Sequence, residues 1–265
     1  MANSDTDTDS AAAEQNRDFV TSLAKGLAVI QAFGPSKARM TLTEVAAETE
    51  LSRAGARRLL LTLENLGFVV RGGRYFELSP KVLELGFAFL ASHNFAGVVQ
   101  RHLESVTEEL QEACSLAVLQ NDDIVYVSRS DASHRLMSIS LSVGSRLPAA
   151  FTSMGRVLLA AMPDAELDAF LDKADLRRYT ERTTTDKATL KEILHTVRAT
   201  GYCIVDQELE PALRSLAVPV LSAGGSVVAA LNVSTNAGRV PIIELEQRYL
   251  PVLKRCADAI RPFMA

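Results

Sequence analysis

The sequence is poor in cysteine and has no long apolar segment. Its three cysteines, Cys114, Cys203 and Cys256, lie far apart, are odd in number and show no Cys-x-x-Cys or Cys/His spacing. This pattern argues against a disulfide framework and a zinc site, so we expect buried apolar thiols, no metal and no cofactor. No apolar run reaches the roughly 18 to 20 residues of a membrane span, and the first residues lack the features of a signal peptide. We therefore expect a cytoplasmic protein that does not contact a membrane.

Recognisable catalytic motifs are also missing. The four histidines are scattered, and no two of them have the spacing of metal ligands. The chain contains neither a Gly-x-Ser-x-Gly elbow nor a Walker-type loop. The sequence therefore favours a protein that is not an enzyme.

Composition and length are those of a folded protein with more than one domain. The 265 residues are 48% hydrophobic and 23% charged, which is the range of soluble globular chains. Residues 1–16 carry four acidic and no basic side chains, so we expect residues 1–18 to form a disordered acidic tail. Residues 51–74 carry five arginines and one acid, in a chain whose formal net charge is −4. This basic stretch is either an ordinary solvated face or a surface that contacts phosphates.

Residues 19–78 have the element order of a winged helix-turn-helix domain. Apolar side chains recur every three or four residues from Phe19 and predict a first helix, with Phe19, Leu23, Leu27 and Ile30 as its apolar stripe. Thr41 and Glu44 form a capping-box pattern, which predicts a short second helix. Ser52 is the expected N-cap of a third helix that ends at Gly67. A β-hairpin is predicted to turn at residues 72–73.

The third helix and the hairpin carry the basic residues that we expect to contact DNA. At 100° per residue, Arg57 and Arg58 lie opposite the apolar face of the helix. A winged helix-turn-helix places such a helix in the major groove and its wing along the backbone. Arginine can bind guanine or phosphate there. The main role expected of Thr41 and Ser52 is to cap their helices, although the amides at helix starts also bind phosphates. The candidate DNA-binding residues are Thr41, Ser52, Arg53, Arg57, Arg58, Arg71 and Arg74.

The remainder of the chain predicts a linker helix and a second domain. Ser79 and Pro80 open a helix that is apolar on more than one side, so we expect residues 79–96 to link the domains and to contact another subunit. From residue 97 to residue 265, strand and helix patterns alternate. They predict an α+β domain with a mainly antiparallel sheet covered by helices.

Eight short motifs are spread over both halves of the chain, namely SLAKGLAVI (22–30), LTEVAA (42–47), LSR (51–53), LENLGF (63–68), TSMGR (152–156), DQELE (206–210), SLAVP (215–219) and ALNVS (230–234). With these motifs the sequence resembles the IclR-type bacterial transcription regulators from Phe19 to about Pro262. A narrower resemblance, to the branch that controls protocatechuate and para-hydroxybenzoate catabolism through the β-ketoadipate pathway, lies in FVTSLAKGL (19–27), SRAGARRLLLTL (52–63) and YFELSPKVLELG (75–86). Glu50 departs from the family, which usually has glycine there, so the turn before the third helix is expected to be wound differently.

The resemblance implies a GAF-like second domain that binds a small carboxylate effector and assembles as a homodimer or a dimer of dimers. The segment from Gly144 leads to a helix that starts near Thr152, whose free amides offer a seat for a carboxylate. Ser153 and Ser215 are equally explained as capping or strand-facing hydroxyls. The alternative role of Asp206 is a cap of the turn after its strand, and that of Asn232 is an ordinary polar group at a strand edge. Leu147 is a further candidate apolar wall. The candidate effector-binding residues are Met137, Gly144, Phe151, Thr152, Ser153, Met154, Asp206, Ser215, Asn232 and Ser234.

The expected function is therefore a DNA-binding transcription regulator that responds to a small carboxylate of aromatic-acid catabolism. A regulator of another pathway that senses a keto acid is the main alternative. An enzyme with an appended DNA-binding domain is a second, and turnover assays with aromatic acids would test it. A structural DNA-binding protein fits poorly with a pI of about 5.7 and a large second domain.

Overall fold

The computed structural model describes residues 19–34, 36–92, 95–132 and 141–264. The chain divides into two compact units, residues 1–88 and 89–265, so the division falls within helix α5 (Leu83–Ser92). Among the described residues, no helix is long and apolar enough to cross a bilayer, and no cluster of His, Cys, Asp and Glu could hold a metal ion.

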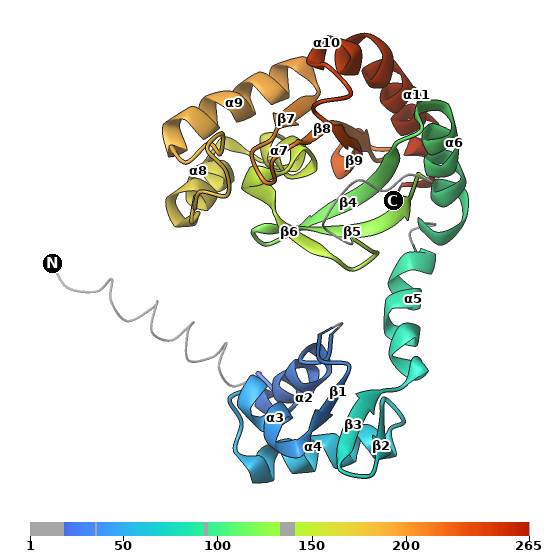
Figure 1. The fold of residues 1–265 in the computed structure, drawn as a ribbon, viewed down its shortest axis with the longest axis vertical. Coiled ribbons are helices and arrows are strands. Elements are labelled where there is room, and N and C mark those ends of the chain that lie inside the picture. The colour runs from blue at the N-terminus through green and yellow to red at the C-terminus, as the bar shows by residue number, and fades with distance from the viewer. Residues whose placement is uncertain (1–18, 35, 93–94, 133–140, 265) are drawn as a thin grey trace, which may run out of the picture. The chain divides into compact units, whose positions relative to one another are not determined.

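The N-terminal unit has the predicted winged helix-turn-helix architecture (Figure 1). Strand β3 lies between β1 and β2 in an antiparallel sheet, and the β2–β3 hairpin is the wing. A core of apolar side chains from all three helices and the sheet holds the unit together. Its elements are α2 (Thr21–Gln31), β1 (Arg39–Thr41), α3 (Leu42–Glu48), α4 (Arg53–Asn65), β2 (Val69–Gly72) and β3 (Tyr75–Leu78).

Local side chains fix where the helices of this unit begin and end. Thr41 and Glu44 form the predicted capping box at the start of α3, and Ser52 caps α4 by accepting a 3.1 Å hydrogen bond from the Gly55 amide. Gly67 follows α4 in a left-handed conformation with φ 81°. Glu50 also adopts left-handed backbone geometry, with φ 55°. The turn therefore takes a conformation that favours glycine despite the glutamate, which corrects the expectation of a different winding.

Helix α2 buries a different face from the one that its apolar stripe suggested. Val29 is fully buried, whereas Phe19 and Leu23 are 61% and 62% exposed. The apolar stripe of α2 predicted the helix correctly. The side chains that enter the core, such as Val29, lie next to the stripe on the helix surface. Phe19, Leu23 and Leu27 are left as an exposed apolar surface, whereas Ile30 packs against the core.

A 3₁₀ turn, Pro80–Val82, and helix α5 follow the wing. Ser79 caps the turn by accepting a hydrogen bond from the Lys81 amide, and its own hydroxyl donates to the Gly67 carbonyl. Leu83, Leu85 and Phe87 are largely exposed along α5. The segment therefore presents the apolar surface that the sequence predicted on more than one side.

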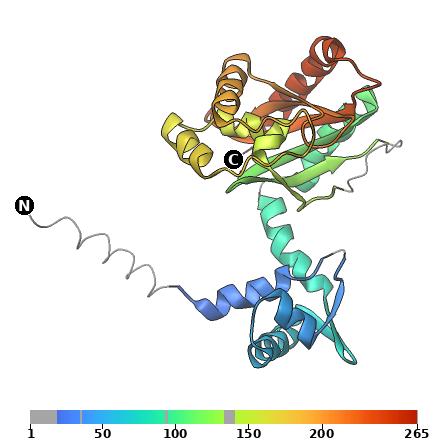
Figure 2. The same ribbon diagram turned by 60° about the vertical axis from the view of Figure 1, so that its left-hand side comes forward.

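The C-terminal unit is built on an antiparallel sheet of strand order β6-β5-β4-β9-β8-β7, so the predicted α+β class is confirmed. β6, β5 and β4 lie side by side in both views (Figures 1 and 2). The strands are β4 (Ala113–Gln120), β5 (Asp123–Ser130), β6 (Arg146–Pro148), β7 (Cys203–Asp206), β8 (Leu213–Leu221) and β9 (Val227–Asn236). The longer helices are α6 (Gln100–Leu110), α7 (Ser153–Ala160), α8 (Asp164–Lys173), α9 (Lys187–Thr200) and α11 (Leu250–Ile260). The short elements are the π-turns Phe95–Val99 and Leu245–Tyr249, the 3₁₀ turns Ala149–Phe151 and Arg261–Phe263, and α10 (Ile242–Glu244).

Helices cover both faces of this sheet, which gives the unit two cores. Side chains of α6 and α11 pack on one face, and those of α7, α8 and α9 pack on the other (Figure 1). The three cysteines are free and buried in these cores, as predicted, and burial raises the pKa of Cys203 and Cys256 to about 12. The second face is the one that contains the candidate ligand cavity.

Candidate functional site

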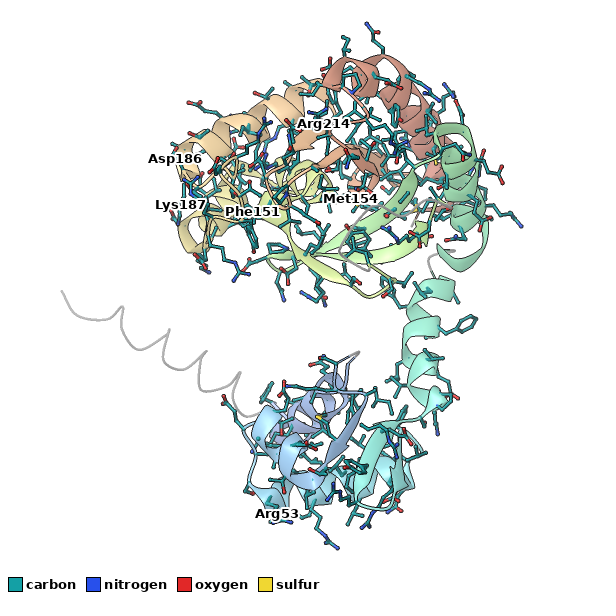
Figure 3. The ribbon with its side chains drawn as sticks, viewed as in Figure 1. Arg53, Phe151, Met154, Asp186, Lys187 and Arg214 are labelled. Carbon is teal, nitrogen blue, oxygen red and sulfur yellow. The ribbon has the colours of Figure 1, made fainter. Side chains whose placement is uncertain are left out.

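The exposed face of α4 is the candidate nucleic-acid interface. Ala56, Leu60 and Leu63 are buried on one side of the helix. Arg57 and Arg58 are exposed on the other side, and Figure 3 places Arg53 at the outer surface of α4. The helix thus presents three cations on a surface that the domain core leaves free, as the helical spacing predicted.

The wing carries a second group of cations next to aromatic rings. Arg71 donates a 3.1 Å hydrogen bond to the Gly73 carbonyl, and Arg74 donates a 2.7 Å bond to the Tyr75 hydroxyl. Arg39 on β1 also lies over the Tyr75 ring, 5.5 Å from its centre. No sequence pattern indicated Arg39, because a three-residue strand has no periodicity to reveal it. Its position beside the hairpin adds a cation to the wing.

Thr41 and Ser52 use their hydroxyl oxygens as caps. The Thr41 hydroxyl accepts a 3.4 Å hydrogen bond from the Glu44 amide, and Glu44 accepts a 2.7 Å bond from the Thr41 amide. Hydrogen bonds from the Thr41 amide and hydroxyl hold the pKa of Glu44 below its usual value. These contacts give both hydroxyls a structural role at the helix starts.

The Ser52 cap leads to a stability prediction. Ser52→Ala removes the partner of the Gly55 amide, which costs about 1 kcal/mol and corresponds to roughly fivefold faster exchange of α4 amides. Hydrogen exchange of the full chain, read by mass spectrometry, measures this opening. Thr62→Ala is the matched control, since the Thr62 hydroxyl bonds only to a carbonyl of its own helix. Equal exchange rates in Ser52→Ala and the wild type would contradict the capping role.

The C-terminal unit contains a small cavity of about 30 Å³ with an open mouth. It lies between strands of the sheet, the start of α7 and the chain that joins β7 to β8. Apolar side chains form most of its walls, with hydroxyl and amide groups among them. The lining residues are Tyr126, Leu141, Leu147, Phe151, Thr152, Ser153, Val205, Leu209, Leu213, Ser215, Asn232 and Ser234.

Six of the candidate effector-binding residues lie in this lining. They come from three segments that are distant in sequence, namely the start of α7, β8 and β9. Leu147, which was expected as an apolar wall, also lines the cavity. The six are Phe151, Thr152, Ser153, Ser215, Asn232 and Ser234.

Three other candidates do not line the cavity, and Met137 lies outside the described residues. Met154 is fully buried in the core between α7 and the sheet (Figure 3). Gly144 has φ 88° in the turn before β6, and its amide donates to the Tyr126 carbonyl. These two positions shape the surroundings of the cavity without reaching it.

Asp206 points away from the cavity because side chains alternate along a strand. Its neighbour Val205 lines the cavity, whereas the Asp206 carboxylate accepts hydrogen bonds of 2.7 Å from Arg214 and 2.5 Å from Arg182. The bond from Arg214 lowers the pKa of Asp206, although partial burial opposes the shift. The carboxylate is therefore an ion-pair partner that ties β7 to β8.

Several lining residues were not predicted. Tyr126, Leu141, Val205, Leu209 and Leu213 line the cavity. Most are apolar side chains that resemble ordinary core residues in the sequence. Burial raises the pKa of Tyr126 to about 12, against the opposing effect of Arg129, so its hydroxyl stays neutral. The apolar alternation of β5 and β7 was the available signal, but it does not distinguish a cavity wall from a core.

A buried ion pair holds together two segments that line the cavity. The Arg156 guanidinium binds both oxygens of Glu208, at 2.6 and 2.7 Å, and its Nε donates a 2.9 Å bond to the Ala150 carbonyl. Burial opposes ionisation of Glu208, but the bonds and charge of Arg156 and a bond from the Thr184 amide outweigh it, so the pKa of Glu208 is lowered. The pair joins α7 to the segment that contains Leu209.

The packing of α7 also depends on one glycine. A Cβ atom at Gly155 would stand 2.1 Å from the Ala149 carbonyl oxygen, which is closer than atoms can approach. The Thr152 hydroxyl accepts a 3.0 Å bond from the Gly155 amide and caps the helix. The helix start, with Thr152 and Ser153, is thereby held at the cavity wall.

Comparisons with known proteins agree with this architecture. Residues 22–73 match the IclR helix-turn-helix domain, and residues 87–261 match the bacterial transcriptional regulator IclR C-terminal domain. The chain is 52% identical over 236 residues to the Pca regulon regulatory protein of Pseudomonas putida. The aligned region covers 89% of this chain and 81% of that protein.

Two solved structures share the fold over almost their full length. A transcriptional regulator from Rhodococcus sp. RHA1 superposes with a TM-score of 0.82 and 48% identity, covering 93% of this chain and 98% of that one. An IclR homologue of Microbacterium hydrocarbonoxydans, solved with 4-hydroxybenzoate, has a TM-score of 0.79 and 26% identity, covering 91% of this chain and 97% of that one. The chain belongs to the IclR family of bacterial transcriptional regulators.

Proposed function

We propose that this regulator binds a small aromatic carboxylate in the cavity of its C-terminal unit. The observation that carries the proposal is the cavity itself, in which leucine, valine and phenylalanine walls surround a few polar groups. The resemblance to a homologue that was solved with 4-hydroxybenzoate supports the same ligand class. The unit binds this metabolite and does not transform it.

The N-terminal unit recognises an operator in this proposal. Arg53, Arg57 and Arg58 on α4 contact base edges or phosphates in the major groove, and Arg71 and Arg74 on the wing contact the backbone or the minor groove. The support is their exposure on one helix face and one hairpin. The protein acts in the cytoplasm, where bacterial DNA is found.

A second copy of the chain covers the apolar surface of the linker. Leu83 and Phe87 are 73% and 64% exposed on α5, which is unusual for large apolar side chains in a monomer. We therefore propose that the protein forms a homo-oligomer through this surface of α5. An effector can regulate DNA binding only if it binds one arrangement of the paired DNA-binding units more tightly than another. In this proposal, effector binding changes that arrangement through α5.

A thermal-shift screen of the full chain tests the ligand class. We expect 4-hydroxybenzoate or protocatechuate to raise the melting temperature, because a ligand at about 100 times its Kd adds roughly 2.7 kcal/mol to the native state. β-Ketoadipate, shikimate and simple keto acids are compared under the same conditions. Ser234→Leu, which fills the cavity, should lose the shift, and Arg57→Ala should keep it. A shift only with keto acids would contradict the aromatic assignment.

A further inference from the structure

Two polar atoms of the cavity wall have no hydrogen-bond partner among the described residues. They are the hydroxyl oxygen of Ser153 and the side-chain carbonyl oxygen of Asn232. Ser153 is 1% exposed and Asn232 is 4% exposed, and both side chains line the cavity. Buried polar atoms are almost always paired, because leaving one unpaired costs free energy. These two atoms are therefore open to hydrogen bonds from a molecule in the cavity.

The surroundings of Asn232 define what its free atom requires. The amide nitrogen of Asn232 already donates a 3.2 Å hydrogen bond to the Ser234 hydroxyl. Its carbonyl oxygen is left as an acceptor, and an acceptor is satisfied only by a donor. An ionised carboxylate has no hydrogen to donate. A ligand must bring a hydroxyl, or an equivalent donor, to this position.

Ser153 has a different environment. It is the first residue of α7, where backbone amides and the helix dipole favour negative charge. Its hydroxyl can donate to an anion that lies against the helix start. The neighbouring Phe151 and Leu147 side chains provide apolar contact for a ring. The same wall thus combines an anion position with an apolar surface.

We propose that the cavity selects a hydroxylated aromatic monocarboxylate, whose carboxylate binds at Ser153 and whose hydroxyl donates to the Asn232 carbonyl oxygen. This inference rests on the proposed function and adds a specific chemical requirement to it. Binding involves no covalent step. An aromatic acid without a hydroxyl leaves the Asn232 carbonyl oxygen unpaired. An aliphatic dicarboxylate places its second carboxylate, which is also an acceptor, against that oxygen.

Calorimetric titration of the full chain with 4-hydroxybenzoate and with benzoate tests this requirement. We expect the wild type to bind 4-hydroxybenzoate about tenfold more tightly or better, since benzoate leaves a buried acceptor unpaired. Asn232→Leu should reduce this preference to less than about twofold, mainly by weakening the hydroxy acid. Ser153→Ala should weaken both acids by a similar factor, because both carry the carboxylate.

The controls separate ligand recognition from general damage. Ser128→Ala removes an equally buried serine whose hydroxyl donates to Gln100 away from the cavity, and it should change neither affinity. Asn232→Gln keeps a neutral carbonyl acceptor and should keep the preference for the hydroxy acid. If Asn232→Leu disturbs folding, Asn232→Ala provides the same comparison with a smaller side chain.

The outcomes distinguish this inference from the function on which it rests. Equal wild-type affinities for the two acids, or a preference that survives in Asn232→Leu and Asn232→Ala, would overturn the inference while leaving an aromatic-acid regulator in place. Binding of neither acid, together with a thermal shift by another metabolite only, would overturn the proposed ligand class as well. Loss of the preference only in the Asn232 variants that lack an acceptor would support the inference.

Discussion

Replacement of both Arg57 and Arg58 by alanine is expected to abolish sequence-specific operator binding while leaving the fold intact. Both side chains are exposed on the face of α4 opposite its buried residues, so their loss removes no core contact. Each bidentate contact of an arginine to a base is worth about 1–3 kcal/mol, so the double variant should bind at least about 30-fold more weakly. Fluorescence anisotropy with an operator obtained by selection from random duplexes measures the change.

The chain offers a control of matched charge for this experiment. Arg177 and Arg178 are also adjacent and exposed, but they lie in the C-terminal unit. Their double alanine variant removes the same two charges and should keep operator affinity within about twofold. Loss of affinity in both double variants would indicate a nonspecific charge effect, and unchanged affinity in Arg57→Ala/Arg58→Ala would refute the assignment of α4.

Single variants can separate base contacts from phosphate contacts. An arginine that binds phosphate contributes about one unit to the slope of log affinity against log salt, and its loss weakens all sequences alike. An arginine that binds a base contributes discrimination at one position of the operator. The same titrations, repeated at several salt concentrations and with point-mutated operators, assign Arg53, Arg57 and Arg58.

Replacement of Arg156 by alanine is expected to cause the largest loss of stability, about 3–5 kcal/mol, because it leaves the Glu208 charge buried without its partner. The two side chains are 2% and 11% exposed. Urea unfolding of the full chain, followed by amide exchange in α7, measures the loss. The matched control is Arg146→Ala, whose pair with Asp123 is exposed and should cost about 1 kcal/mol or less. A similar small loss for Arg156→Ala would contradict the role assigned to the pair.

The same ion pair predicts an acid dependence of stability. Because the pKa of Glu208 is lower in the folded chain than in the unfolded one, its contribution is complete above the unfolded value of about 4.3. The contribution is lost as the pH falls through the lower folded pKa. As the pH falls through that acidic range, the free energy of unfolding of Glu208→Gln should therefore decrease less than that of the wild type. Urea unfolding at several pH values measures the difference.

The elements with strong local signals could be predicted from the sequence. Ser52, the regular apolar face of α4 and the glycine pair of the wing each act through neighbouring residues, so their consequences can be derived without tertiary context. Helix α2 shows the limit of this reasoning. Its apolar stripe predicted the helix, but which side meets the core depends on contacts with the other helices.

The cavity was only partly predictable, because it is assembled from segments far apart in the sequence. The resemblance located the start of α7 and strand β9. It also indicated Asp206, but side chains alternate along a strand, and it is the neighbouring Val205 that faces the cavity. Arg156 and Glu208 are separated by 52 residues, so no local pattern indicated their pairing. Tyr126 gave no signal beyond an apolar alternation that a core strand would also show.

Operator affinity with and without saturating 4-hydroxybenzoate shows whether a metabolite in the C-terminal cavity controls the DNA-binding unit. Coupling between two sites of one protein is typically about 5- to 150-fold in affinity. We predict a change of at least about fivefold in the wild type, which Ser234→Leu should remove. An operator Kd that is the same with and without the acid, in a chain that calorimetry shows to have bound the acid, would mean that the cavity does not control the DNA-binding unit.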